Sequence, residues 1–189
     1  MFAGHFGLAA AVKSKTNRVP LWSLMLGTQL LDVIFVPLFV TGVETLEPVA
    51  DGYGGSIIHA DYTHSLVGAL LIALIAGHFA KLKWGMNGGF LISAVVFSHW
   101  ILDLLVHRAD LPILPGNYGN LPLLGFGLWQ YPTVSMIIEL IIIASGWLLY
   151  TRSILRESAG SSKKRAMTSS AVLAIFLALS LLTDVFGIG

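Results

Sequence analysis

The sequence contains no cysteine and few charged residues. Among its 189 residues, 11% are charged and 56% are hydrophobic, whereas a soluble domain carries about 25% charged residues. The lack of cysteine excludes disulfides, thiolate zinc or iron–sulfur ligation, and a cysteine nucleophile. A mean hydropathy of +0.81 indicates an integral membrane protein. We therefore expect a single membrane domain over residues 1–189, with no room for a sizeable soluble domain.

Long apolar stretches predict the membrane spans. A hydrocarbon core of about 30 Å requires about 20 apolar residues per helix. Five stretches meet this requirement: 21–42, 63–80, 87–106, 131–150 and 169–188. The first 12 residues are apolar but too few to span. The predicted fold is thus an all-α bundle of about five transmembrane helices plus a short N-terminal helix or half-span.

The basic residues are sorted between alternate loops. All Lys and Arg residues except Arg108 lie in the segments 13–18, 81–83 and 152–165. The positive-inside rule assigns such loops to the cytoplasm. We expect a multi-pass protein of the plasma membrane with outer loops at 43–62 and 107–130. Its expected partners are membrane lipids and a small-molecule or lipid-linked substrate, and no nucleic acid.

Ionisable residues interrupt the apolar segments. Those within the segments or at their ends are His5, Asp32, His64, His78, His99, Asp103, His107, Glu139 and Asp184. An ionisable group inside a bilayer costs several kcal/mol, so a functional site is the default interpretation. At a rise of about 1.5 Å per residue, most of them can meet between the midplane and the outer face. His78 and Asp184 fit this layer less well, and His78 is interpreted as a packing residue.

The stretch SHWILDLLVH (98–107) carries the densest part of this set. His99, Asp103 and His107 are four residues apart, so they share one stripe of a helix. Imidazoles together with carboxylates suit Zn, Mn, Fe or Ni. We predict a divalent metal, with zinc as first choice. The candidate ligands are His5, Asp32, His64, His99, Asp103, His107 and Glu139. His107 is equally compatible with an interfacial position, and Asp110 is expected in the outer loop, apart from the site.

Several stretches also resemble the bacterial and archaeal membrane-bound metal-dependent hydrolases, a family distantly similar to the zinc-dependent phospholipase C and single-strand nuclease group. The matching stretches are GHFGLA (4–9), LLD (30–32), DYTHSL (61–66), SHWILDLLVHRADLP (98–112) and, for one branch of the family, GLWQYP (127–132) with Glu139. The resemblance covers residues 1–150, which would form the metal-site core. The last span, 169–188, matches nothing specific.

The resemblance implies metal ligands at His5, Asp32, His64, His99 and Asp103. Two departures from the family pattern matter for the chemistry. Many relatives read Pro-Asp-x-Asp where this chain has LDVI (31–34), so a site of two or three metals is not implied. Relatives also read His-Arg-Gly where this chain has HAD (59–61), which removes an obvious phosphate-binding arginine and leaves Arg108 as the candidate in its place.

The leading functional hypothesis is hydrolysis of a phosphoester, either lipid-linked or free, reached from the outer side. A bound metal lowers the pKa of its water to about 7 and polarises the phosphoryl oxygen. In this hypothesis the candidate catalytic residues are Asp103, Glu139 and Arg108. Asp103 or Glu139 would serve as ligand or general base, and Arg108 would steady an anionic substrate.

Two other functions use the same residues. A transporter or permease would hold a metal ion or small solute near the midplane, and the short first segment and Pro37 are compatible with its discontinuous helices. A haem protein would use His64 and His99 as axial ligands. The interspersed carboxylates argue against haem.

Overall fold

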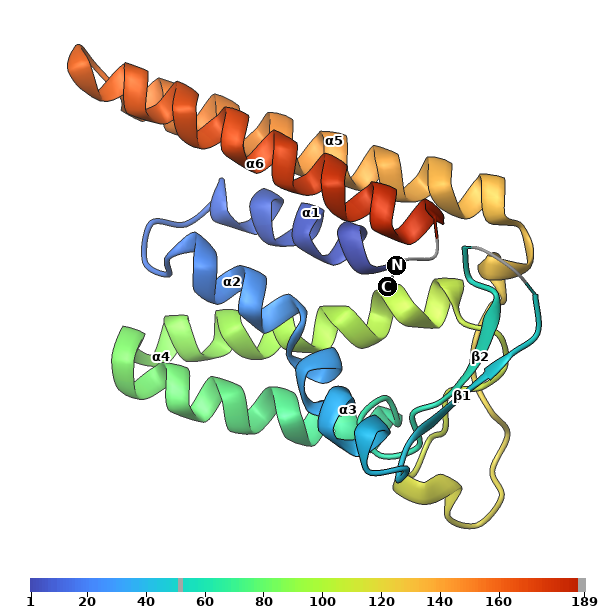
Figure 1. Ribbon diagram of the computed structural model, residues 1–189. Helices are drawn as coiled ribbons and strands as arrows, with labels where there is room; N and C mark the ends of the chain where they lie inside the picture. Colours follow the sequence, from blue (N-terminus) through green and yellow to red (C-terminus); the bar gives the residue numbers. More distant parts are fainter. Residues whose placement is uncertain (51–52, 187–189) are drawn as a thin grey trace.

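The fold is a bundle of helices with a small sheet at one end (Figure 1). The computed structural model describes residues 1–50 and 53–186. In chain order the elements are α1 (Phe2–Lys13), α2 (Leu21–Thr28), α3 (Leu30–Val40), β1 (Thr45–Pro48), β2 (Ser56–His59), α4 (Leu66–Val106), the 3-10 turns η1 (Pro115–Asn117) and η2 (Leu128–Gln130), α5 (Pro132–Glu157) and α6 (Ser161–Phe186). The molecule is mostly helical, as predicted.

Three helices of the described chain, α4, α5 and α6, are long and apolar enough to cross a membrane. The pair α2 and α3 meets the same criterion only as a unit, and a bend of 47° separates its two halves. The bend falls at Gln29, whose φ of −110° and ψ of 6° interrupt the helix. The predicted span 21–42 is therefore a broken helix. Helix length and composition alone support three or four spans rather than the five expected.

The 41-residue helix α4 turns back on itself at Gly85. This residue has a φ of +72°, which glycine adopts without the steric cost that a side chain would impose. Figure 1 shows the two arms side by side, and the Ser93 hydroxyl of the second arm donates to the Ala73 carbonyl of the first at 3.0 Å. The arms occupy the stretches 66–84 and 86–106, which correspond to two of the predicted apolar segments.

The short helix α1 lies inside the bundle, between α2, α5 and α6 (Figure 1). Its close packing on α5 depends on two glycines. A Cβ atom added to Gly146 would lie 2.0 Å from the Gly7 carbonyl oxygen, and one added to Gly7 would lie 2.9 Å from the Ile143 Cα atom. Small residues at helix contacts let backbones approach closely. This contact fixes the position of the turn that carries His5.

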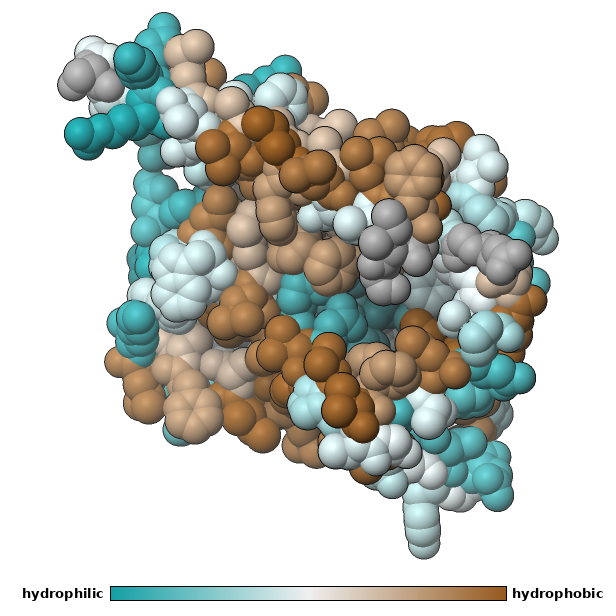
Figure 2. Space-filling model, in the orientation of Figure 1, coloured by the Kyte–Doolittle hydropathy of each residue, from teal (hydrophilic) through white to brown (hydrophobic). Residues whose placement is uncertain are grey.

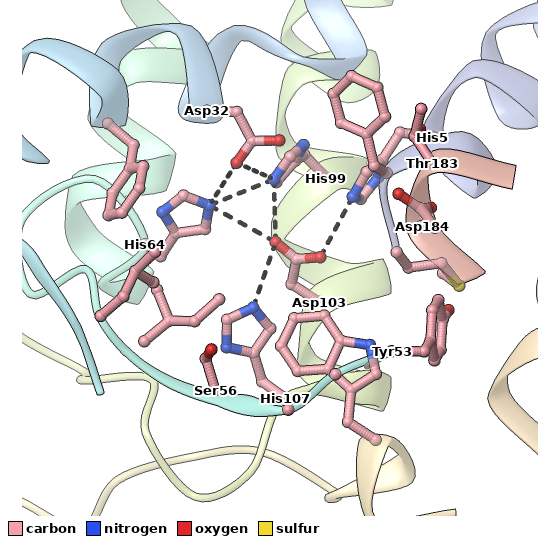
Figure 3. A pocket seen from close by; sticks show the side chains of 18 of the residues that line it. His5, Asp32, Tyr53, Ser56, His64, His99, Asp103, His107, Thr183 and Asp184 are labelled. Atoms are coloured by element: carbon pink, nitrogen blue, oxygen red, sulfur yellow. Dashed lines mark hydrogen bonds and ion pairs between the residues drawn. The ribbon is translucent and has the colours of Figure 1, made fainter. Parts of the chain in front are cut away.

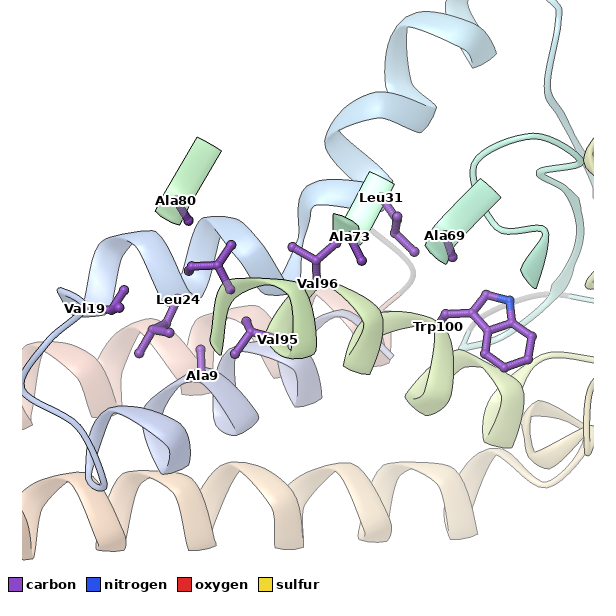
Figure 4. Packing of buried hydrophobic residues seen from close by; sticks show 11 residues of the cluster. Ala9, Val19, Leu24, Leu31, Ala69, Ala73, Ala80, Val95, Val96 and Trp100 are labelled. Carbon is purple, nitrogen blue, oxygen red and sulfur yellow. The ribbon is translucent and has the colours of Figure 1, made fainter. Parts of the chain in front are cut away.

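Small and β-branched side chains fill the core between α1, α2, α3 and both arms of α4 (Figure 4). The first arm contributes only alanines to the buried part of this cluster, whereas the second contributes larger side chains. The buried members are Ala9, Val19, Leu24, Leu31, Ala69, Ala73, Ala80, Ile92, Val95, Val96 and Trp100. Trp100 also donates its indole N–H to the His64 carbonyl at 2.8 Å. The core therefore connects directly to the segment before α4 that carries His64.

The two ends of the bundle differ in composition. The basic segments 13–18, 81–83 and 152–165 all lie at one end, and the two-stranded sheet and the long connections lie at the other (Figure 1). Strands β1 and β2 are antiparallel, with Thr45 opposite His59 and Pro48 opposite Ser56. This sheet is an addition to the all-α fold expected. Together with residues 107–131 it forms a cap over that end of the bundle.

Candidate metal centre

Six of the seven predicted ligands form one cluster beneath the cap (Figure 3): His5, Asp32, His64, His99, Asp103 and His107. Two of them, His99 and Asp103, lie one turn apart on the second arm of α4, with His99 Nε2 2.9 Å from Asp103 Oδ2. His107 follows the last residue of the same helix, and its Nε2 atom lies 3.9 Å from Asp103 Oδ2. The spacing of four residues thus places the three side chains along one edge of the cavity.

Two other segments bring Asp32 and His64 to the same place. Asp32 lies on the first turn of α3, and its Oδ1 atom is 3.5 Å from His99 Nε2 and 3.4 Å from His64 Nε2. His64 lies just before α4, with its Nε2 atom 3.2 Å from His99 Nε2 and 3.5 Å from Asp103 Oδ2. Residues from three separate segments therefore direct one nitrogen or oxygen each toward a shared point.

His5 reaches the cluster from α1. Its ring stacks on that of His99 with 3.9 Å between centroids, and its Nε2 atom lies 3.2 Å from Asp103 Oδ1. Its other nitrogen, Nδ1, is buried and has no hydrogen-bond partner among the described residues. Two groups of side chains are close enough to hold a metal ion: His5 with His99 and Asp103, and Asp32 with His64 and His99.

A hydrogen bond on the far side of each of three imidazoles sets its tautomer. The Thr28 carbonyl can only accept, so His99 Nδ1 donates to it, at 2.6 Å. The Asp110 carboxylate likewise accepts from His107 Nδ1 at 2.9 Å. In the neutral form of both rings the Nε2 atom then carries the lone pair, directed into the cluster. Metal-binding histidines in proteins almost always show this arrangement.

The third imidazole is anchored through a hydroxyl group. Thr63 Oγ1 donates to the Glu44 carboxylate, at 2.9 Å from Oε2, and therefore accepts from His64 Nδ1 at 2.8 Å. Glu44 is buried and also accepts from the backbone N–H groups of Tyr62 and Thr63. In the neutral ring, His64 Nε2 thus also directs its lone pair into the cluster. The chain Glu44–Thr63–His64 orients this ring as firmly as a direct carboxylate contact would.

The resulting arrangement is suited to a cation. His64 Nε2 and His99 Nε2 lie 3.2 Å apart with carboxylate oxygens beside them, and in the neutral rings both carry lone pairs. Their lone pairs would repel each other in a buried site unless a positive charge lay between them. The two nitrogens lie 3.2 Å from each other and 2.9 to 3.5 Å from Asp32 Oδ1 and Asp103 Oδ2. Ligand atoms around a tetrahedral zinc ion, with bonds of about 2.0–2.1 Å, lie roughly 3.3 Å apart. The donor set fits such an ion.

The cluster forms the floor of a cavity of about 590 Å³. All its histidines and Asp103 are buried, and Asp32 is partly exposed at the cavity wall. The remaining lining includes Phe35, Tyr53, Trp129 and Asp184. The lining contains neither lysine nor arginine among the described residues.

Glu139 and Arg108 lie outside the cluster. The Glu139 carboxylate is buried on α5, where it accepts from the Gly4 backbone N–H at 2.8 Å and from the Tyr53 hydroxyl at 2.6 Å. Burial, with the nearby Glu139 charge, raises the pKa of Tyr53, so the phenol stays protonated as a donor. Arg108 donates from Nη2 to the Gly54 carbonyl at 3.3 Å. The structure brings neither of these two predicted catalytic residues into contact with the histidines.

Three supporting residues were not identified from sequence. Glu44 and Asp110 lie in connections at the cap end of the bundle, where a carboxylate carries no cost that would mark it as functional. Asp110, expected apart from the site, also accepts from the Ile58 backbone N–H at 3.0 Å and so ties β2 to His107. The position of Thr63 next to His64 was the one local signal available, because a neighbouring hydroxyl can reach the ring.

The chain matches no family model, and no curated protein or solved structure is significantly similar to it. The function is therefore inferred from the arrangement of the side chains.

Proposed function

We propose that this protein is a membrane-embedded, metal-dependent hydrolase that acts on a phosphoester. One divalent ion, with zinc as first choice, would be held by Asp32, His64, His99 and Asp103. The observation that carries the proposal is the orientation of the imidazoles. Their Nδ1 atoms are committed to acceptors, and their Nε2 atoms face one point together with two carboxylates. Without a cation this arrangement destabilises the folded protein, and a bound cation stabilises it.

A bound metal of this kind would supply a nucleophilic water with a pKa near about 7 and polarise the phosphoryl group. The protein groups around it have separate roles. His5, placed 3.2 Å from Asp103 Oδ1, orients that carboxylate so that Oδ2 faces His99 and His64. The partly exposed Asp32 leaves one side of the cluster open to the cavity.

His107 is the best placed general base. It lines the cavity, its Nε2 atom lies 3.9 Å from the nearest cluster oxygen, and Asp110 fixes its tautomer. A base held in orientation by a carboxylate is a recurring catalytic arrangement, because the carboxylate stabilises the imidazolium that forms. In this role His107 accepts a proton from a water or substrate in the cavity. The structural support for it is stronger than that for Glu139, whose two oxygens are engaged elsewhere.

The test is to measure metal content and hydrolysis on the same purified protein. We expect the full-length protein, purified in detergent, to contain a stoichiometric divalent metal and to hydrolyse bis(p-nitrophenyl) phosphate. His99→Ala should lose both properties. His78→Ala is the matched control, because His78 is exposed on the first arm of the same helix and has no contact with the cluster. Metal without turnover on any phosphoester would reject the hydrolase and keep the metal centre.

We also propose that each arm of α4 and the broken pair α2–α3 cross the membrane, which with α5 and α6 gives five spans. The shared end of the basic segments supports a cytoplasmic position for that end and an outer position for the cap. A reporter fused after Gly160 should then be cytoplasmic, and one inserted near Gly54 external. The opposite result would place the metal centre toward the inner face.

Transport is a second candidate, and the break at Gln29 favours it. Discontinuous helices with a free backbone carbonyl near a midplane site are typical of secondary transporters, and the Thr28 carbonyl at this break contacts His99. Uptake of radioactive zinc into proteoliposomes, abolished by His99→Ala, would identify a transporter. Haem receives less support. Two axial ligands would lie on opposite faces of the iron, whereas His64 Nε2 and His99 Nε2 lie only 3.2 Å apart.

A further inference from the structure

The cavity opens on the side of the bundle rather than at its end. Figure 2 shows a hydrophilic hollow with hydrophobic surface above and below it, in the same orientation as Figure 1. In that view the long helices run across the picture, so the visible face lies parallel to their axes. The hollow falls between α3 and the end of α6 (Figure 1). A surface in this position faces lipid once the helices span a membrane.

The rim of the opening is apolar. Phe2, Val36, Leu46 and Phe186 all line the cavity and are 40% to 67% exposed. These side chains come from α1, α3, β1 and α6. Exposed apolar groups of this size around a polar floor are unfavourable in water but are suited to contact with acyl chains. The two surfaces together match a molecule with a polar head and an apolar body.

The end of the cavity toward the cap is covered. Ile58 of β2 donates to Asp110, and Arg108 donates to the Gly54 carbonyl, so the sheet is tied to the connection after α4. Trp129 is buried beneath this connection, with its ring 4.5 Å from that of His107. In the part of the chain that the structure describes, these contacts cover the route along the bundle axis, and the side opening leads to the cluster.

We infer that the cavity admits a membrane phospholipid sideways from the bilayer, with its headgroup against the metal cluster and its acyl chains outside the rim. The phosphoester follows from the proposed function, whereas the sideways entry stands on the geometry alone. A volume of about 590 Å³ lies within the range of roughly 300–1,000 Å³ typical of small-molecule sites. It therefore suits the headgroup and its glycerol rather than a whole two-chain lipid.

The absence of native cysteine permits a direct test by site-specific labelling. Ser56 lines the cavity (Figure 3). Ser56→Cys, loaded with zinc, is placed in phosphatidylcholine vesicles that contain phosphatidylethanolamine with a maleimide on its headgroup. Covalent attachment of the lipid is followed by a gel shift. We expect the lipid to label Ser56→Cys, because its headgroup enters the cavity.

Two bulky substitutions locate the route of entry. Val36→Trp, added to Ser56→Cys, should slow labelling about tenfold or more by narrowing the rim. Ile141→Trp is the matched control, because Ile141 is similarly exposed on α5 and does not line the cavity. It should leave the rate unchanged. Labelling by a water-soluble maleimide alone, or a rate insensitive to Val36→Trp, would overturn the inference.

Failure of this inference can be distinguished from failure of the proposed function. Labelling requires no turnover. Labelling that is slowed by Val36→Trp, without hydrolysis of any phosphoester, would therefore support the sideways opening and reject the hydrolase. Hydrolysis of bis(p-nitrophenyl) phosphate, with neither labelling by the lipid nor hydrolysis of phospholipid in vesicles, would keep the hydrolase and reject lipid entry.

Discussion

The substitution Asp103→Asn distinguishes a metal ligand from a packing residue at the centre of the cluster. The buried carboxylate of Asp103 lies 2.9 Å from His99 Nε2, 3.5 Å from His64 Nε2 and 3.2 Å from His5 Nε2. Asparagine has nearly the same shape but removes one negative charge and one strong ligand. The substitution therefore changes the chemistry of the site with little change in packing volume.

The expected loss of metal stabilisation follows from mass action. At a free zinc concentration of 100 times the dissociation constant, binding stabilises the folded protein by about 2.7 kcal/mol. Changes in residues that only support a ligand weaken binding by about 10–100-fold, so loss of a direct ligand should cost at least about 100-fold. At the same zinc concentration the stabilisation then falls to about 0.4 kcal/mol. The zinc-induced rise in Tm should shrink from roughly 5–10 °C to roughly 1–2 °C.

The two interpretations of Asp103 differ most clearly without metal. As a metal ligand, the carboxylate is an uncompensated charge in the metal-free protein, and the asparagine amide can donate to His99 Nε2 instead. Metal-free Asp103→Asn should then be as stable as the unaltered protein, or more stable. If Asp103 is instead a packing residue that hydrogen-bonds His99 and His5, Asp103→Asn should lower the free energy of unfolding by about 1–3 kcal/mol, with or without zinc.

Melting curves of the full-length protein in detergent, with chelator and with added zinc, provide the measurement. Asp61→Asn is the charge-matched control, because Asp61 precedes α4 at a partly exposed position outside the cluster. It should leave zinc stabilisation unchanged. Full zinc occupancy and full zinc stabilisation in Asp103→Asn would refute the metal-ligand interpretation of the whole stretch.

Three further substitutions test how the site is supported. Glu44→Gln should weaken zinc binding about 10–100-fold in competition with a chelating dye, because the anchor of His64 is lost; unchanged affinity would reject that anchor. Asp110→Asn should lower hydrolysis about 10²-fold or more while zinc content stays near normal, because it removes the charge that stabilises protonated His107; a loss of zinc instead would make His107 a ligand. Gly146→Ala should cost about 1–3 kcal/mol in thermal unfolding and lower zinc content, because its Cβ would lie 2.0 Å from the α1 backbone; wild-type behaviour would show that this contact does not position His5.

The helices were largely predictable because hydropathy is a local property. Each predicted apolar stretch is helical over most of its length, and the short N-terminal segment is a helix as well. The break at Gln29 and the sheet were not predicted. Both halves of the broken helix are apolar, so hydropathy does not reveal the break. The sheet forms between two strands of only four residues each. Their pairing depends on contacts with the rest of the cap above the cavity.

The site was predictable where burial makes charge expensive. Asp32, His64, His99 and Asp103 stand out because each interrupts an apolar segment or lies at its edge, and the structure brings these four together. Glu44 has an equally buried side chain, yet it precedes β1 in a polar connection where acidic residues are common. The sequence therefore marks the residues that face the metal position but not those that orient them.

Glu139 shows what the depth of a residue in the membrane predicts and what it does not. Counting residues along a helix gives the height of a side chain in the membrane, but not the direction in which the helix turns it. The structure directs Glu139 of α5 toward the start of α1, where its carboxylate accepts from the Gly4 backbone N–H, and Asp184 of α6 accepts from that of Ala3 at 3.0 Å. Negative groups are favourable at a helix N-terminus, where backbone N–H groups lack partners within the helix. These carboxylates hold α1 in the bundle and so present His5 to Asp103, which connects Glu139 to the candidate metal centre through the backbone of α1.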